Sequence, residues 1–442
     1  MRLVHTADLH LGVENYGRTD PATGLNTRFL DFLARLDDVV EHAVRRRADL
    51  VISAGDAFRS REPSPTHQRE FARRVRRLTA AGIPVLLLVG NHDLASLPAK
   101  ATAMDVYAAL EVPGVTVGRN PEVIRLETKS GPLQVACLPA LHRSRLLGEE
   151  AGRLGAEEVR TRSQEALCRL IDELAAQVRP DAPAVLAAHV AVEGATLGSE
   201  ANLMAGPEPL VPVARIANPA FAYVALGHVH KFQDLNPGRR PPLDYARGGP
   251  ANAGRGDPEP VEGPAVVYAG SLERVDFGEE NEAKGFVEVE IAGNEAHYEF
   301  VEVAARRFVT IEVEVKGEDP TAEVVEAIGK RDVADAVVRT RVISEREVTL
   351  DDAEVRRALE PPFWALPVAR EVRERAVAAR SPELTERLTD PLAALEEYLK
   401  ATETPAARAE ELREYAQRLV AAMRSEEALA YADAPAEAQA ER

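Results

Sequence analysis

Clusters of Asp, Asn and His recur over the first 230 residues of the sequence, each directly after a short apolar run. The clusters are Asp8-Leu-His10, Gly55-Asp56, Gly90-Asn91-His92-Asp93, His189 and Gly227-His228-Val-His230. Seven of these side chains, two carboxylates (Asp8, Asp56), one amide oxygen (Asn91) and four imidazoles (His10, His189, His228, His230), form a ligand set without thiolates. Such a set suits Mn, Fe or Zn better than Ca. The seven side chains exceed the needs of one ion but suffice for two ions that share a bridging carboxylate. Paired ions activate water and hold phosphoryl oxygens, so the set predicts a two-metal hydrolase.

Each cluster taken singly has an ordinary explanation. Asp-x-His occurs by chance, Gly-Asp is mostly a turn, and a lone His189 on an apolar strand is more often a core histidine. Gly-Asn-His-Asp and Gly-His-x-His are stronger signals. The prediction depends on all five clusters occurring in this order, each at the end of an apolar run.

The apolar runs before these clusters have the length and composition of buried strands. They are residues 3–4, 50–52, 85–89, 133–138, 184–188, 223–226 and 266–268. Helical patterns lie between the first three of these runs. Residues 29–47, for example, carry an apolar stripe at helical spacing. This alternation predicts a layered α/β domain. Because open α/β sheets bind ligands beyond the carboxyl ends of their strands, the clusters are expected to converge there.

The motifs resemble the calcineurin-like metallophosphoesterase superfamily and, within it, the SbcD-type nucleases of double-strand-break repair complexes. The markers are His5-Thr-Ala-Asp8-Leu-His10-Leu-Gly12, Ala54-Gly55-Asp56-Ala-Phe58, Pro63-Ser-Pro65 and Val267-Tyr-Ala-Gly-Ser271-Leu-Glu-Arg-Val-Asp-Phe-Gly-Glu279. The last marker is the most specific, because generic phosphoesterases lack it. The resemblance covers residues 1 to about 345. It implies a layered β-sandwich flanked by helices, a smaller α+β capping domain and a helical C-terminus.

The resemblance also implies a role for each site residue. One metal ion would be held by Asp8, His10, Asp56 and His230, and the other by Asp56, Asn91, His189 and His228. His92 would be a catalytic histidine that protonates the leaving 3′ oxygen, and Asp93 would orient it. The implied cofactors are two divalent metal ions, and Mn is the preferred identity for both. The implied activity is cleavage of DNA, as a double-strand exonuclease and single-strand endonuclease.

The sequence departs from many relatives at Arg59, where they carry a histidine that helps place duplex DNA. An arginine can bind phosphate with two hydrogen bonds but cannot shuttle a proton, so the balance between exonuclease and endonuclease activity stays open. Arg18, Arg59 and Arg61 lie near the motif loops and are predicted phosphate contacts.

Composition narrows the class of protein. The 442 residues are 45% hydrophobic, and no apolar run approaches the length of a membrane span. The polar residues His5, Asp8 and His10 occupy the place of a signal-peptide core, and Cys137 and Cys168 are too few for a disulfide framework. These features favour a cytoplasmic protein. The net charge of −18 disfavours a purely electrostatic DNA binder.

The expected domain order follows from changes of pattern along the chain. The expected parts are a di-metal domain (1–304) with a mobile loop (236–263), an α+β capping domain facing DNA (305–348), a helical linker (349–380), a helical segment binding an SbcC-type ATPase (381–424) and a disordered tail (425–442). The helices expected at 64–80 and 101–110 occupy the positions where the family forms its homodimer.

Two other functions remain open. A phosphatase or cyclic-nucleotide phosphodiesterase of the same superfamily explains the ligands but not Ser271–Glu279 or the second domain. A non-catalytic scaffold for the ATPase does not explain an intact ligand set.

Overall fold

The computed structural model describes most of the N-terminal 372 residues and little of the chain beyond them. The described residues are 1–95, 97, 100–148, 154–198, 208–237, 263–359, 362–372, 395–396, 399, 408–410 and 412–417. The chain divides into two units, residues 1–343 with 348–371 and residues 344–347 with 372–442. Most of the predicted loop at 236–263 and of the predicted ATPase-binding segment at 381–424 lies outside the described residues, as does the whole predicted tail.

The first sheet has six strands in the order β12-β11-β1-β2-β3-β4. Their bounds are β1 (Arg2–Thr6), β2 (Leu50–Ser53), β3 (Val85–Leu88), β4 (Val115–Gly118), β11 (Gly285–Ala292) and β12 (Glu295–Glu302). Strands β1 to β4 are parallel, and the β11–β12 hairpin adds to β1 in the antiparallel sense. The carboxyl ends of β1, β2 and β3 therefore lie side by side.

The second sheet has six strands in the order β5-β6-β7-β8-β10-β9. Their bounds are β5 (Glu122–Thr128), β6 (Gly131–Leu138), β7 (Ala184–His189), β8 (Tyr223–Gly227), β9 (Gln233–Asp234) and β10 (Ala265–Tyr268). Strands β6, β7, β8 and β10 are parallel. Leu50 and Leu86 of the first sheet share one buried cluster with Val185 and Ala225 of the second, so the sheets pack face to face as the expected sandwich.

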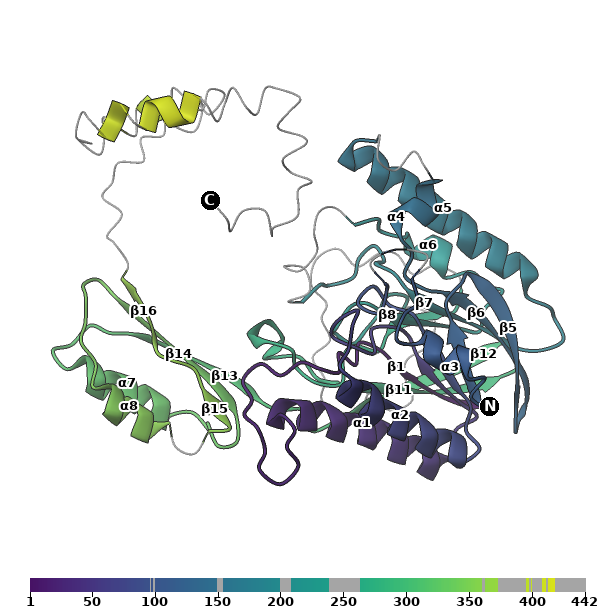
Figure 1. The fold of residues 1–442 in the computed structure, drawn as a ribbon, viewed down its shortest axis with the longest axis horizontal. Helices are drawn as coiled ribbons and strands as arrows, with labels where there is room; N and C mark the ends of the chain where they lie inside the picture. Colours follow the sequence, from purple (N-terminus) through teal and green to yellow (C-terminus); the bar gives the residue numbers. More distant parts are fainter. Residues whose placement is uncertain are drawn as a thin grey trace. The chain divides into compact units, whose positions relative to one another are not determined.

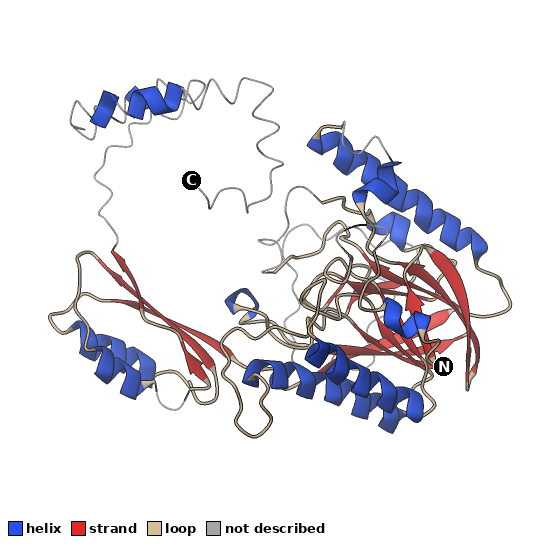
Figure 2. Ribbon diagram, viewed as in Figure 1, coloured by secondary structure: helices blue, strands red, loops and turns tan. Residues whose placement is uncertain are grey.

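Helices cover the outer faces of both sheets (Figure 1, Figure 2). The first sheet carries α1 (Thr27–Arg46), α2 (Pro65–Ala80) and the short α3 (Asp105–Ala109), and the second carries α4 (Arg143–Leu147), α5 (Ala156–Gln177) and α6 (Val213–Ile216). Helix α1 begins at the cap Asn26, whose side chain accepts from Arg28 N–H. The predicted apolar stripe of α1 is buried from Phe29 to Val40, whereas Val44, at its end, is exposed. In the part of the chain that the structure describes, no helix is long and apolar enough to span a membrane.

A smaller α+β layer follows residue 306. It contains β13 (Phe308–Glu314), α7 (Pro320–Gly329), β14 (Val337–Ser344), α8 (Asp352–Ala358), β15 (Trp364–Ala365) and β16 (Ala369–Val372). Strands β13 and β15 pair with β14 in the parallel sense, and β16 also pairs with β14. Residues of α7 and α8 pack with β13 and β14 in one apolar cluster.

The region expected to be a helical linker, 349–380, differs from the prediction. Helix α8 is present, but residues 364–365 and 369–372 are strands that pair with β14. The backbone groups of β14 offer hydrogen bonds that a helix at 369–372 could not use, and this pairing overrides the local helical pattern. The α+β layer therefore reaches beyond the expected boundary at 348.

Candidate active site

The five predicted clusters meet at one edge of the sandwich. Asp8 and His10 follow β1, Asp56 follows β2, Asn91 and His92 follow β3, His189 ends β7, and His228 and His230 follow β8. Backbone hydrogen bonds join the first two loops: Asp8 N–H donates to Gly55 O at 3.1 Å and His10 N–H to Asp56 O at 3.0 Å. Strands of both sheets thus position the seven predicted ligands, and the contacts described below connect all seven.

One half of the site contains Asp8, His10 and His230. One potential ligand atom from each lies within 4.8 Å of the other two. The Nε2 atoms of His10 and His230 are 2.9 Å apart. Both carboxylate oxygens of Asp8 accept from the backbone N–H of His228 at 3.0 Å, which joins this half to the other.

The other half of the site is built around Asn91. Its Oδ1 lies 2.8 Å from His189 Nε2 and 3.0 Å from His228 Nδ1. The rings of His189 and His228 meet edge to face with centroids 5.2 Å apart. Asn91, His189 and His228 also line a cavity of about 230 Å³.

The carboxylate of Asp56 lies between the two halves. Its Oδ2 is 3.4 Å from His189 Nε2 and 3.9 Å from His10 Nε2, while its Oδ1 accepts from His92 N–H at 2.8 Å. Burial raises the pKa of Asp56, but the neighbouring His189 and His10 outweigh burial and hold it below its usual range. The group is therefore ionised at neutral pH, and one oxygen faces both halves, as a bridging ligand requires.

The hydrogen bonds of the imidazoles test whether a metal ion fits. His189 Nδ1 lies 2.8 Å from the carbonyl of Ala54 and must donate to it, so Nε2 of the neutral ring is a lone pair that faces the oxygens of Asn91 and Asp56. His230 Nδ1 likewise lies 2.7 Å from Glu279 Oε1, which leaves its Nε2 as a lone pair facing His10. Lone pairs that converge in this way fit a bound cation, and the donor set suits a divalent metal.

The charges of the site favour a cation as well. Burial lowers the pKa of His189, but Asp56 and Asp8 outweigh it and raise that pKa to about 10 in the protein alone. The pocket thus favours a positive charge beside Asp56 and Asp8, and a metal ion bound by the neutral His189 imidazole would supply it.

The glycines of the motifs permit this close packing. A Cβ at Gly55 would overlap the ring of His189, one at Gly90 would overlap Asp56, and one at Gly227 would overlap the carbonyl of Ala54. Several ligand residues adopt left-handed backbone angles that are uncommon outside glycine. They are Asp8 (φ 51°), His10 (φ 42°), Asp56 (φ 52°) and His228 (φ 100°). Strained backbone of this kind is typical of functional sites.

His92 stands beside the ligands. Its ring meets that of His10 edge to face with centroids 4.9 Å apart, and its Nδ1 lies 3.1 Å from Arg59 O. His92 and Asn91 line a cavity of about 610 Å³ together with Arg61 and Lys100.

Asp93 does not orient the His92 ring as predicted. In the described part of the chain its carboxylate accepts from the backbone N–H groups of Ala57, Phe58 and Gly90 at 3.1 to 3.2 Å. Those bonds tie together the loops after β2 and β3. The physical reason for the difference is that Asp93 turns into the buried loops, where three donors need an acceptor, and the carbonyl of Arg59 fixes His92 instead.

The three predicted phosphate-binding arginines have different positions. Arg61 is exposed and lines the cavity beside His92. Arg59 is half-buried near His10, and its charge adds to the burial and the His230 charge that lower the pKa of His10. Arg18 is exposed in the loop before α1, where its backbone pairs with Thr27; none of these contacts joins it to the site.

Two acidic residues contact ligands and were not predicted from the sequence. Glu208 Oε2 lies 2.9 Å from His228 Nε2, and Glu279 Oε1 lies 2.7 Å from His230 Nδ1. Carboxylates at the outer nitrogen of a ligating histidine fix its tautomer. The sequence hinted at a role for Glu279, because it ends the most specific family marker. Glu208 lies in none of the motifs, so nothing in the sequence pointed to its contact.

Comparison with known proteins places all seven predicted ligands in one family match. The family of calcineurin-like phosphoesterases matches residues 1–232, more than half of the chain. The chain therefore belongs to the calcineurin-like phosphoesterase family, and the expected fold class is confirmed.

Subunits of the nuclease SbcCD and a DNA double-strand break repair protein are among its relatives, which confirms the resemblance seen in the motifs. The chain is 31% identical over 256 residues to the SbcD component of the nuclease SbcCD of Rhodobacter capsulatus, covering 54% of this chain and 60% of that protein. It is 29% identical over 245 residues to the protein of the same name from Escherichia coli, covering 53% and 57%. It is 32% identical over 123 residues to the DNA double-strand break repair protein Mre11 of Haloferax volcanii, covering 28% and 25%. The matches thus span less than two thirds of each relative.

Proposed function

We propose that this protein is a Mn-dependent DNA nuclease of the SbcD type, acting as a double-strand exonuclease and single-strand endonuclease in double-strand-break repair. The observation that carries the proposal is the position of Asp56, whose Oδ2 faces His189 on one side and His10 on the other. This is the arrangement that a two-metal phosphodiesterase needs. The names of the relatives supply the substrate class.

The proposed ligands divide into two sets that share Asp56. Asp8, His10, Asp56 and His230 would hold one ion, and Asp56, Asn91, His189 and His228 would hold the other. When bound, the two ions would supply a nucleophilic water and charge neutralisation at the phosphate. The mixed nitrogen and oxygen donors, without sulfur, favour Mn.

His92 would hold and deliver the proton. Its Nδ1 is engaged by the carbonyl of Arg59, and its backbone N–H donates to Asp56 Oδ1. Nε2 is therefore the atom that gives a proton to the leaving 3′ oxygen. Asp93 contributes by joining the loops that carry Asp56 and Asn91.

The phosphate backbone would enter through the cavity beside His92. Arg61 and Lys100 line it, and Arg59 is close to Arg61 in sequence. These cations give a local attraction for DNA in a chain whose net charge is −18. Arg59 replaces a protonatable histidine with a fixed charge, so it serves binding and not proton transfer.

The test compares three substrates in Mn-containing buffer: duplex DNA, single-stranded DNA and a small phosphate ester. The proposal predicts cleavage of both DNA substrates. Hydrolysis of the ester alone would favour a phosphatase, and metal binding without hydrolysis of any substrate would favour a scaffold.

The proposed partner is an SbcC-type ATPase that binds residues 381–424. Leucines at helical spacing in this segment support an amphipathic face. Deletion of residues 381–442 is expected to abolish co-purification with the ATPase and to leave Mn-dependent cleavage of single-stranded DNA nearly unchanged. A truncated chain that still binds the ATPase would contradict this assignment.

The proposed oligomer is a homodimer formed around α2 and α3. Val106 and Leu110 support it, because they leave 50% and 70% of their surface exposed at α3. Leu110→Glu is expected to shift the mass measured by light scattering from dimer to monomer. A wild-type protein that is monomeric at micromolar concentration would contradict the dimer.

A further inference from the structure

The segment Ser271–Glu279 is the most specific sequence marker, yet it supplies none of the proposed metal ligands. It follows β10 and ends in a short 3-10 helix, Phe277–Glu279. We propose that Glu279 of this segment is a positioning residue, which holds His230 in the tautomer and direction that a metal ion requires. The inference deepens the proposed function and rests on its two-metal site.

The carboxylate of Glu279 is held on both of its oxygens. Oε1 lies 2.7 Å from His230 Nδ1. Oε2 accepts from Val275 N–H at 3.0 Å and lies 2.9 Å from Lys284 Nζ. The side chains of Glu279 and Lys284 are fully buried. The carboxylate therefore has one orientation, with Oε1 directed at the histidine.

This orientation decides which nitrogen of His230 carries the proton. An ionised carboxylate only accepts, so His230 Nδ1 must donate to Oε1. In the neutral ring, Nε2 is then a lone pair, and it faces His10 Nε2 at 2.9 Å in the half of the site that also contains Asp8. Carboxylate–histidine–metal arrangements of this kind orient ligands and raise their basicity.

Lys284 holds both residues of the Glu279–His230 contact. Besides its bond to Glu279, its ammonium donates to the backbone carbonyl of His230 at 3.1 Å and to Glu282 Oε2 at 2.9 Å. One buried cation thus holds the backbone and, through Glu279, the ring of the same histidine. A buried pair with its remaining hydrogen bonds made is rigid, because each alternative position leaves a charge unpaired.

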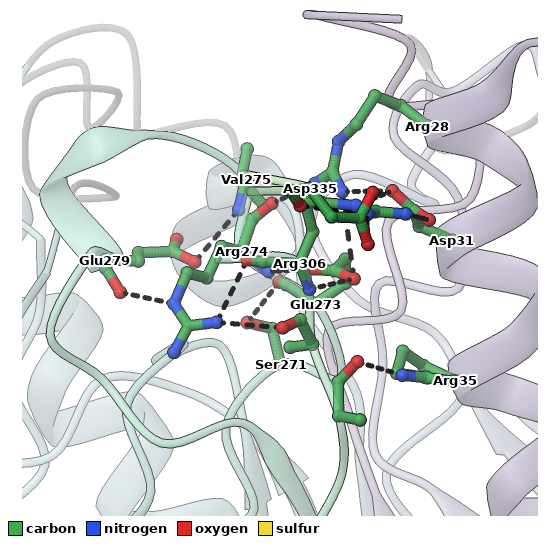
Figure 3. Close-up of polar contacts among 12 residues, drawn as sticks. Arg28, Asp31, Arg35, Ser271, Glu273, Arg274, Val275, Glu279, Arg306 and Asp335 are labelled. Atoms are coloured by element: carbon green, nitrogen blue, oxygen red, sulfur yellow. Dashed lines mark hydrogen bonds and ion pairs between the residues drawn. The ribbon is translucent and has the colours of Figure 1, made fainter. Parts of the chain in front are cut away.

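Arg274 holds the backbone of the segment (Figure 3). Its guanidinium donates to the carbonyls of Glu279 at 3.2 Å, Glu282 at 2.7 Å and Arg306 at 3.0 Å. The N–H of Arg306 donates to both oxygens of Glu273 at 2.9 Å. The position of Glu279 is therefore fixed from the junction with the smaller α+β layer, and this accounts for Glu273, Arg274 and Glu279 in the marker.

Glu279→Gln tests the assignment, because a carboxamide cannot reproduce these contacts. If its oxygen faces His230, its NH₂ group meets two donors, Val275 N–H and Lys284. If its NH₂ group faces His230, the ring must move its proton to Nε2, the nitrogen facing the metal. We expect Mn affinity about 10- to 100-fold weaker at one of two sites, the range found for outer carboxylates. In the Mn²⁺ electron paramagnetic resonance spectrum, the signature of a coupled ion pair is expected to disappear.

Two further variants separate positioning from loss of the fold. The double variant Glu279→Gln/Lys284→Met removes both buried charges and is expected to fold yet to lose the coupled-pair signal. Glu282→Gln is the matched control, because it removes another carboxylate from Lys284 without touching His230, and it is expected to bind two ions. If the wild type and Glu279→Gln both bind two ions with the same affinity, this inference is wrong and the proposed function still stands. A wild type that binds no ions would overturn it together with the proposed function.

Discussion

The Cα of Gly55 packs against the imidazole of His189, so closely that a Cβ at position 55 would overlap the Nδ1 atom. The same Nδ1 atom donates to the carbonyl of Ala54 at 2.8 Å. Gly55 also has a φ of 102°, which disfavours other residues. The glycine before Asp56 is therefore required by a histidine 134 positions further along the chain.

Gly55→Ala should displace His189 and weaken metal binding without unfolding the sandwich. We expect Mn affinity at least about 10-fold lower, because a displaced ligand costs no less than a displaced outer group. Isothermal titration with Mn measures it, and circular dichroism checks the fold. Gly293→Ala is a matched control, since its φ is also positive but nothing lies near its Cβ position. Equal Mn binding by both variants would contradict the packing argument.

Asp56→Asn should abolish hydrolysis and leave the fold intact. The change removes the negative charge that faces both His189 and His10, while an amide oxygen can still accept from His92 N–H. We expect at least about 100-fold weaker metal binding, beyond the effect of outer residues. Near-wild-type cleavage by a folded Asp56→Asn protein would rule out a shared bridging ligand.

His92→Ala separates a substrate-directed histidine from a metal ligand. The variant should retain two bound ions, because the hydrogen bonds described for the seven predicted ligands do not involve the His92 ring. It should lose about 10² to 10⁴ in kcat, the usual contribution of a general acid. Metal content by mass spectrometry and single-turnover cleavage give the two readouts. Loss of an ion in this variant would make His92 a ligand.

Arg59→Ala should weaken DNA binding in a salt-dependent manner, since a phosphate contact is lost. The slope of log affinity against log salt concentration should decrease in magnitude by about 1, the value for one lost phosphate contact. Arg59→His is the informative partner, because its carbonyl can still accept from His92 while its side chain regains a titratable group. We expect it to raise exonuclease activity on duplex ends. Unchanged binding and product patterns in both variants would remove Arg59 from the DNA surface.

Arg28→Met should destabilise the junction below the smaller α+β layer. Arg28 is fully buried, donates to Asp31 and to the carbonyl of Arg274 at 2.7 Å, and lies 3.7 Å from Glu273 (Figure 3). Its loss leaves buried carboxylates short of a partner, which typically costs about 3 to 5 kcal/mol in the free energy of unfolding. Urea titration measures the change.

Arg160→Met is the control for that measurement. Its pair with Glu157 is on the surface, where water screens the attraction and such pairs contribute little to stability. Equal stability of the two variants would show that the Arg28 contacts do not hold the junction.

The sequence was enough to bring the candidate site residues together. Asp56, His189 and the other predicted ligands follow apolar runs, and the carboxyl ends of such strands lie at one edge of the sandwich. The hairpin of β11 and β12 was not predicted, because its strands mix Glu with apolar residues in a pattern that only pairing with β1 makes regular. The strands within 364–372 were missed for the same reason, since only pairing with β14 defines them.

The outer contacts of the ligands were beyond sequence reasoning. Glu208 meets His228 only through the tertiary fold, and no spacing links the two residues. Asp93 was expected to contact its neighbour His92, but three buried N–H groups provide stronger partners. The side chains of consecutive loop residues such as His92 and Asp93 point in different directions, so adjacency in the sequence did not imply contact.

Anomalous diffraction at the Mn edge, from crystals grown with Mn, would show how many ions bind and where they lie. Two peaks are expected, one on each side of Asp56 Oδ2. The first should be ligated by Asp8, His10 and His230, and the second by Asn91, His189 and His228. A single peak, or two peaks that do not share Asp56, would contradict the proposed two-metal site.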